Sequence, residues 1–137
     1  MKRRIKILAV DREEIILKSI RKALKSDEGL EYEITACGTA LEGLQLIRSD
    51  SFDIVFIDIV LPGINGIEIL RRIKNICPGI PVIIMSGFAS ERIHSPASNM
   101  ASSADEQLNS PAGYLLKPFT TEEINSIVVK ILGSTGS

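Results

Sequence analysis

The sequence predicts an α/β fold built on a doubly wound, five-stranded parallel sheet, and three observations support this prediction. Five short runs rich in β-branched residues alternate with segments whose apolar residues recur at helical spacing. The central run, Ile54 to Ile57, is too short for a buried helix and lacks polar alternation, as expected of a strand covered on both faces. Four of the runs are followed by a polar residue, and the carboxyl ends of parallel strands lie at one edge of a sheet.

The five strands are bounded by changes in composition along the chain. The turn-forming residues between Pro62 and Gly66 separate the central strand from the helix that follows it. The expected strands are Ile5–Val10, Tyr32–Cys37, Ile54–Ile57, Pro81–Met85 and Gly113–Leu116.

Helices are expected to begin near residues 13, 40, 67 and 121, and each has a start or stop signal. The first continues to about Lys25, and its apolar residues recur at helical spacing. The first helix begins with the acids Glu13 and Glu14, and Gly38 or Thr39 can cap the second. Pro78 ends the third, and Thr120 with Glu123 forms a capping box at the start of the last.

The stretch from Ala89 to Pro111 differs from the rest of the chain. It is rich in Ser, Ala and Asn and shows little helical periodicity before residues 101 to 108. We therefore expect the fourth helix to be irregular or displaced and much of the stretch to be mobile. The single histidine, His94, lies in it and is assigned no role.

Composition excludes several classes of function. The 137 residues suit one domain, and 45% apolar with 24% charged residues is typical of a soluble globular protein. Because 16 basic residues balance 17 acidic ones, no net field favours a direct nucleic-acid or membrane partner. No apolar stretch reaches the roughly 18 residues of a membrane span, and Cys37 and Cys77 lack metal-ligand spacing, so we expect a cytoplasmic protein with reduced cysteines.

The polar residues at four strand ends form a chemical set: Asp11, Asp58, Ser86 and Lys117. Two carboxylates at one pocket suit a hard divalent cation such as Mg²⁺, which binds one or two carboxylates together with phosphate oxygens. An ammonium and a hydroxyl opposite them suit a phosphoryl group. A single strand-end aspartate is more often a loop cap than a site residue, but four such residues at the ends of four strands favour a site.

At these residues the sequence closely resembles the receiver domain of two-component response regulators. The matching segments are Ile7–Asp11, Ile57–Gly66, Met85–Gly87 and Tyr114–Phe119. The resemblance covers nearly the whole chain, and it implies a flavodoxin-like, receiver-type sheet with strand order 2-1-3-4-5. We expect the receiver domain to cover residues 1–132, and the Gly- and Ser-rich composition of residues 133–137 indicates a flexible tail or the start of a linker.

The resemblance implies a role for each matching residue. Asp58 would be the phospho-acceptor, and Asp11, Asp58 and the backbone carbonyl of Val60 would hold Mg²⁺. Ser86 and Lys117 would contact the phosphoryl group, and the peptide bond between Lys117 and Pro118 would be cis. In the family, movement of the serine leaves space for an aromatic side chain, here Tyr114, although Tyr114 is equally explained as a half-buried strand aromatic.

Two features depart from the family pattern. The family usually has a second acid directly after the first, and here that position is Arg12, which removes a metal ligand and adds a fixed positive charge. We therefore expect weak Mg²⁺ binding. Glu13 could reach the metal or one of its waters, but a place in the first helical turn explains it better. The second departure is the segment between Ser86 and Lys117, which is longer and more polar than in the family. By the resemblance, it would carry the fourth helix, part of the surface through which receivers signal.

The leading interpretation is a phospho-accepting switch with self-catalysed phosphotransfer, not an enzyme acting on a metabolite. Its expected partners are a sensor histidine kinase or histidine phosphotransfer protein, with an output domain or downstream protein and a homodimer as further options. The alternative is a phosphorylation-independent docking module in which Arg12 replaces the cation. Enzyme interpretations fit poorly, because Val60 cannot act as the second acid of an aspartyl phosphatase and the chain has no glycine-rich nucleotide loop.

Overall fold

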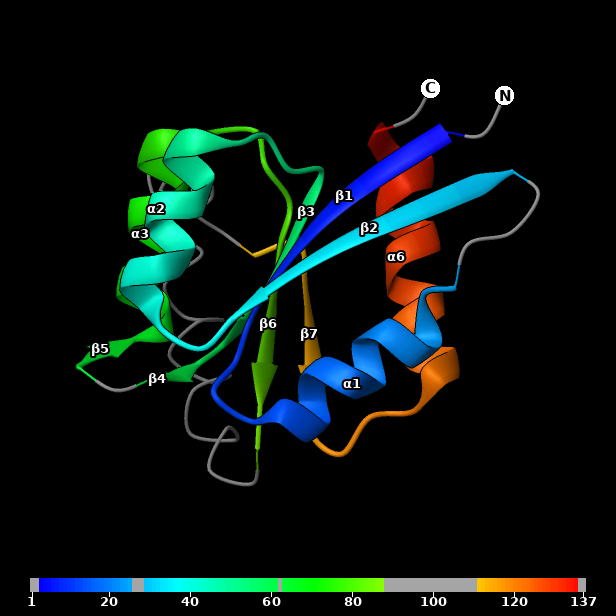
Figure 1. Ribbon diagram of the computed structural model, residues 1–137, viewed down its shortest axis with the longest axis horizontal. Helices are drawn as coiled ribbons and strands as arrows, with labels where there is room; N and C mark the ends of the chain where they lie inside the picture. The colour runs from blue at the N-terminus through cyan, green and yellow to red at the C-terminus, as the bar shows by residue number, and fades with distance from the viewer. Residues whose placement is uncertain (1–2, 26–28, 62, 88–110, 136–137) are drawn as a thin grey trace, which may run out of the picture.

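The computed structural model describes residues 3–25, 29–61, 63–87 and 111–135. Five parallel strands form one sheet in the order β2-β1-β3-β6-β7, which confirms the predicted order (Figure 1). The strands are β1 (Arg3–Val10), β2 (Leu30–Cys37), β3 (Ile54–Asp58), β6 (Val82–Ser86) and β7 (Gly113–Leu116).

Helices cover both faces of this sheet, as a doubly wound fold requires. In Figure 1, α2 (Ala40–Ser49) and α3 (Gly66–Ile76) lie on one side, and α1 (Glu14–Ala23) and α6 (Thr121–Thr135) lie on the other. Alternate residues of β3 supply the two cores: Val55 and Ile57 pack with α2 and α3, whereas Ile54 and Phe56 pack with α1 and α6. All residues of β3 are buried, which confirms the expected two-sided strand.

Two of the predicted helix caps are confirmed by hydrogen bonds. The Thr39 hydroxyl accepts from the backbone N–H of Glu42 at 3.1 Å, at the start of α2. At α6, the N–H of Thr120 donates to the Glu123 carboxylate at 2.9 Å, and the N–H of Glu123 donates to the Thr120 hydroxyl at 3.1 Å. Each bond satisfies a backbone donor that a helix start leaves without an intrahelical partner.

Several boundaries differ from the sequence-based prediction. β1 begins at Arg3 and β2 at Leu30, two residues earlier than expected in each case, and the ion pair of Arg4 with Glu31 at 3.5 Å joins this extension across the strands. Helix α1 ends at Ala23 rather than Lys25. Helix α6 continues to Thr135, into the 133–137 segment that was expected to be a flexible tail.

A short hairpin between β3 and α3 was not predicted. It consists of β4 (Val60–Leu61) and β5 (Ile64–Asn65), which pair antiparallel. Two-residue strands are too short for sequence periodicity to reveal. The segment for which an irregular or displaced fourth helix was predicted, including His94, lies outside the described residues. Within the described part of the chain, no helix has the length and apolarity needed to cross a bilayer.

Candidate functional site

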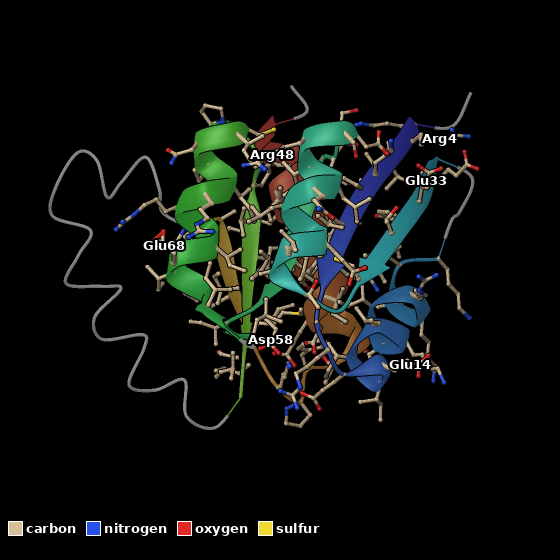
Figure 2. All side chains as sticks on the ribbon, turned by 60° about the vertical axis from the view of Figure 1, so that its left-hand side comes forward. Arg4, Glu14, Glu33, Arg48, Asp58 and Glu68 are labelled. Atoms are coloured by element: carbon tan, nitrogen blue, oxygen red, sulfur yellow. The ribbon has the colours of Figure 1, made fainter. Side chains whose placement is uncertain are left out.

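The carboxyl end of the sheet carries the chemistry predicted from the sequence. Asp58 and Ser86 are the last residues of β3 and β6, and Asp11 and Lys117 directly follow β1 and β7. Figure 2 shows Asp58 at the same end of the molecule as Glu14, the first residue of α1. The parallel pairing of β1, β3, β6 and β7 therefore gathers residues distant in sequence at one edge.

The Lys117 ammonium lies at the centre of three carboxylates. Its Nζ is 2.8 Å from Asp11 Oδ2, 3.2 Å from Glu13 Oε1 and 3.4 Å from Asp58 Oδ2. The Asp11 and Asp58 side chains are buried, with 0% and 6% of their surface exposed, while that of Glu13 is 55% exposed. The cluster thus holds two buried acids, one exposed acid and one cation.

This arrangement changes the proton affinity of two groups. Burial, partly offset by the Val60 N–H, raises the pKa of Asp58, and the neighbouring Asp11 charge adds to the rise. For Lys117, burial acts to lower the pKa, but attraction from Asp11, Asp58 and Glu13 outweighs it, so the pKa is raised. Lys117 is therefore charged at neutral pH.

Local hydrogen bonds fix the two aspartates on their loops. Asp11 Oδ1 accepts from the N–H of Glu13 at 2.8 Å, and Asp58 Oδ1 accepts from the N–H of Val60 at 3.1 Å. Each bond joins a carboxylate to the backbone two residues later, a typical aspartate turn. The other oxygen of each carboxylate faces Lys117.

At the strand ends, the buried Ser86 Oγ has no hydrogen-bond donor or acceptor among the described residues. Asp11 Oδ2, by contrast, is paired with Lys117 Nζ at 2.8 Å. Buried oxygens without such partners are costly unless a ligand completes them. The Ser86 hydroxyl is therefore consistent with a site that binds an additional group.

The donor set also fits a hard cation. One carboxylate oxygen from each of Asp11, Glu13 and Asp58 can be chosen so that all three lie within 4.8 Å of one another. Oxygen ligands of this kind are those that Mg²⁺ prefers. Sequence reasoning had placed Glu13 mainly in the first turn of α1, but Glu13 directly precedes that helix and its side chain accepts a hydrogen bond from Lys117 Nζ at 3.2 Å.

The remaining predicted residues lie around this cluster. Val60 is 60% exposed and is paired with Asn65 in the β4–β5 hairpin. Tyr114 is 36% exposed on β7, and partial burial raises the pKa of its hydroxyl. Arg12 is exposed, and the ion pairs described among residues 3–25, 29–61, 63–87 and 111–135 do not include it. The Lys117–Pro118 bond is cis, as expected.

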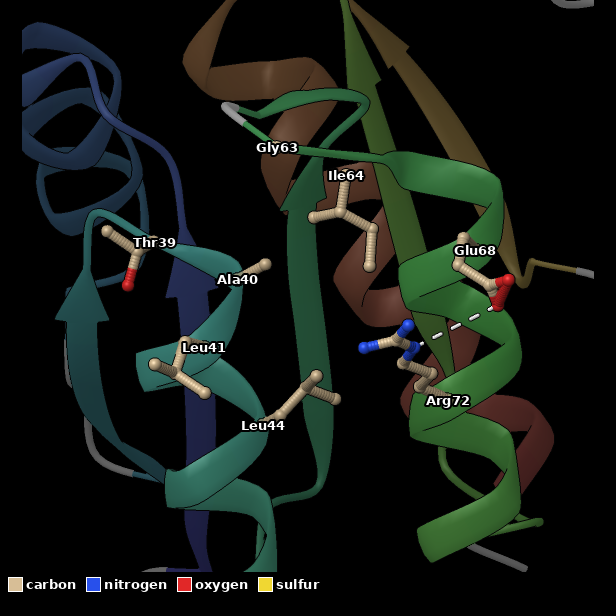
Figure 3. A pocket seen from close by; sticks show the side chains of 8 residues that line it. All are labelled: Thr39, Ala40, Leu41, Leu44, Gly63, Ile64, Glu68 and Arg72. Atoms are coloured by element: carbon tan, nitrogen blue, oxygen red, sulfur yellow. Dashed lines mark ion pairs between the residues drawn. The ribbon is translucent and has the colours of Figure 1, made fainter.

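A groove of about 500 Å³ lies elsewhere, between α2 and α3. Figure 3 shows Leu41 and Ile64 on its walls, with the Glu68–Arg72 ion pair of 4.0 Å at one side. Its lining includes none of the residues of the carboxylate cluster. The groove is therefore separate from the site, and we assign it no ligand.

The fold and the strand-end cluster define a phosphoryl-accepting receiver of the two-component type. The family model of the response regulator receiver domain matches residues 7–129, and the chain belongs to that family. Phosphorylation at a strand-end aspartate is the standard function of such domains.

Named relatives agree with this assignment. The chain is 26% identical to the probable transcriptional regulatory protein TcrX of Mycobacterium tuberculosis, over 96% of this chain and 51% of that protein. It is 29% identical to the response regulator MprA of Mycolicibacterium vanbaalenii, over 88% of this chain and 47% of that protein. The chain therefore spans about half the length of these curated relatives.

Solved structures show the same fold. A response regulator receiver domain protein from Clostridium thermocellum superposes with a TM-score of 0.77 at 28% identity, covering 96% of this chain and 97% of that one. A CheY-like receiver domain protein from Methanospirillum hungatei gives a TM-score of 0.76 at 30% identity, with 96% of both chains covered.

Proposed function

We propose that this receiver catalyses transfer of a phosphoryl group onto its own Asp58. The observation that carries the proposal is the ion pair between Asp58 Oδ2 and Lys117 Nζ, 3.4 Å apart and beside the buried Asp11. A carboxylate attacking an anionic phosphoryl group is opposed by charge, so a fixed cation at the point of attack is the feature that the chemistry most requires.

In this proposal, an Asp58 oxygen attacks phosphorus in line with the leaving group. The new O–P bond forms as the bond from phosphorus to the donor breaks, and the electron pair leaves with the donor, an imidazole nitrogen if the donor is phosphohistidine. Lys117 exchanges its ion pair with Asp58 for contacts with the phosphoryl oxygens and stabilises their negative charge. The Ser86 hydroxyl, which is buried and has no partner among the described residues, donates to one of those oxygens.

Mg²⁺ is the cofactor that the donor set fits. Asp11, Asp58 and the Val60 carbonyl would hold it, and when bound it neutralises phosphoryl charge. Arg12 lowers the affinity for Mg²⁺, because it supplies a positive charge where the family usually has an acid. Phosphorylation measured over a series of Mg²⁺ concentrations should require less Mg²⁺ for Arg12→Asp than for the parent, and coincident curves would contradict this effect of Arg12.

In this proposal, phosphorylation of Asp58 changes the conformation of the domain through Ser86 and Tyr114. Ser86 lies at the end of β6, where its backbone carbonyl accepts from the N–H of Lys117 at 2.7 Å. A shift of Ser86 toward a new phosphoryl group would leave space that the Tyr114 side chain can occupy. In this proposal, Tyr114 is the residue whose position differs between the two states.

The partners are proposed from the same chemistry. The phosphoryl donor is a sensor histidine kinase or a histidine phosphotransfer protein, and the setting is the cytoplasm, where ATP charges such donors. The named relatives are about twice as long as this chain, which supports an output domain or a separate downstream protein that reads the switch. A homodimer of receivers is a further form that the proposal includes.

Intact-mass measurement after incubation with acetyl phosphate and Mg²⁺ tests the central claim. We expect one phosphate adduct on the parent chain and none on Asp58→Asn. Glu14→Gln is the matched control, because it changes an exposed acid of α1 outside the cluster. A parent chain without an adduct at any Mg²⁺ concentration would refute the proposal and favour the phosphorylation-independent docking module.

A further inference from the structure

The stretch from Asp11 to Glu13 presents its side chains in two directions. Glu13 has an extended backbone (φ −91°, ψ 113°), and its N–H donates to Asp11 Oδ1 at 2.8 Å. Arg12 lies at a bend between them, and this hydrogen bond closes an aspartate turn around it. The turn leaves Glu13 beside Asp11 at Lys117, while Arg12 is exposed and takes no part in the described ion pairs of the cluster.

The Glu13 side chain is not needed to cap the start of α1. Glu13 is the N-cap residue, yet its side chain makes no capping hydrogen bond. Its described partner is Lys117, at 3.2 Å, and the Glu13 side chain is 55% exposed. Ion pairs this exposed contribute little to stability, so moving the carboxylate to another cation costs little.

The second acid needed at this site is therefore present in the chain, one position later than in the family pattern. We propose that Glu13 supplies the cation with the carboxylate that Arg12 cannot, by exchanging its contact with Lys117 for a contact with the metal. The Asp11 side chain beside Glu13 is fully buried, and one carboxylate oxygen from each of Asp11, Glu13 and Asp58 lies within 4.8 Å of the others. This inference rests on the cation binding included in the proposed function.

The exchange has a consequence for Lys117. In the structure this lysine contacts all three carboxylates. With Glu13 and Asp11 holding the cation, fewer anions would hold the ammonium, and Lys117 would be available to contact a phosphoryl group at Asp58. Glu13 thus acts as a positioning residue for Lys117 as well as a metal ligand.

The test is Mn²⁺ affinity, read from the electron paramagnetic resonance signal of free Mn²⁺ in titrations of the full chain at about 0.15 M salt, where distant charges are screened. Mn²⁺ is the probe because it accepts the same oxygen ligands as Mg²⁺. Glu13→Gln should weaken binding at least about tenfold, the lower end of the loss caused by removing even outer-shell partners of a metal. Glu14→Gln removes the same charge one residue away and should change affinity by less than about twofold.

Each other outcome overturns the assignment. Unchanged affinity in Glu13→Gln would show that the carboxylate does not reach the metal, and equal losses in both variants would show a general charge effect. Phosphate adduct formation by the parent in the same buffer separates this inference from the proposed function. An adduct together with unchanged Mn²⁺ affinity in Glu13→Gln would reject Glu13 as a ligand and leave Asp58 as the acceptor.

Discussion

Replacing Lys117 by methionine should destabilise the metal-free protein, because Asp11 and Asp58 would remain buried without a cation. Removing one partner of a buried ion pair costs about 3–5 kcal/mol. We expect the lower end, about 3 kcal/mol, because the Lys117 side chain is 13% exposed and its third partner, Glu13, is largely solvated. For a chain of this size that loss corresponds to a melting temperature lower by roughly 10 °C.

The loss of folding stability caused by Lys117→Met should depend on pH. Because its neighbours raise the pKa of Lys117 above the ordinary 10.5, its stabilising effect is fully present at pH 7 and would be lost only at higher pH. Toward acidic pH, protonation of Asp58, whose pKa burial raises, removes its ion pair with Lys117 in the parent. The difference between parent and Lys117→Met should therefore be largest near neutral pH and should narrow toward about pH 4.

Urea unfolding followed by far-ultraviolet circular dichroism is a suitable assay, since the chain has no tryptophan. Lys18→Met, at an exposed position of α1, is the control and should behave like the parent. Millimolar Mg²⁺ should restore more stability to Lys117→Met than it adds to the parent, because it replaces the missing positive charge. A Lys117→Met variant as stable as the parent at pH 7 without divalent cations would refute the reasoning.

Three further predictions concern single residues. Burial raises the pKa of Asp58 above its ordinary 3.8, so Asp58→Asn should stabilise the fold at pH 7 but not at pH 3, as measured by urea unfolding at each pH. Gly66→Ala should cost about 3 kcal/mol because its Cβ would meet Ile59 Cα at 2.6 Å, whereas Gly79→Ala, with open space, should change thermal melting little. Burial raises the pKa of Cys37 to about 11, so its alkylation followed by mass spectrometry should lag behind that of the other thiol.

Much of this fold could be predicted from local pattern. The run from Ile54 to Ile57 identifies a two-sided strand, because a strand buried on both faces needs no polar alternation. The capping residues Thr39 and Thr120 mark helix starts, because their hydroxyls satisfy nearby backbone donors. The position of Asp58 at the functional edge followed from strand direction alone.

Other features depend on contacts that local sequence cannot reveal. The β4–β5 hairpin has two residues per strand, which is shorter than any recognisable period. The extension of β1 to Arg3 depends on pairing with β2, including the Arg4–Glu31 contact across the strands. Such features become visible only when the partner strand is in place.

The sequence by itself determined the alternation of strands and helices, the edge at which the site lies, and the identity of Asp11, Asp58, Ser86 and Lys117, because each follows from short-range periodicity and chain direction. Only the tertiary structure decided that Glu13 meets Lys117, 104 residues away, and that Arg12 stays outside the cluster. It also decided the direction in which the pKa of Asp58 moves, because burial and opposing charges depend on every element packed around the carboxylate.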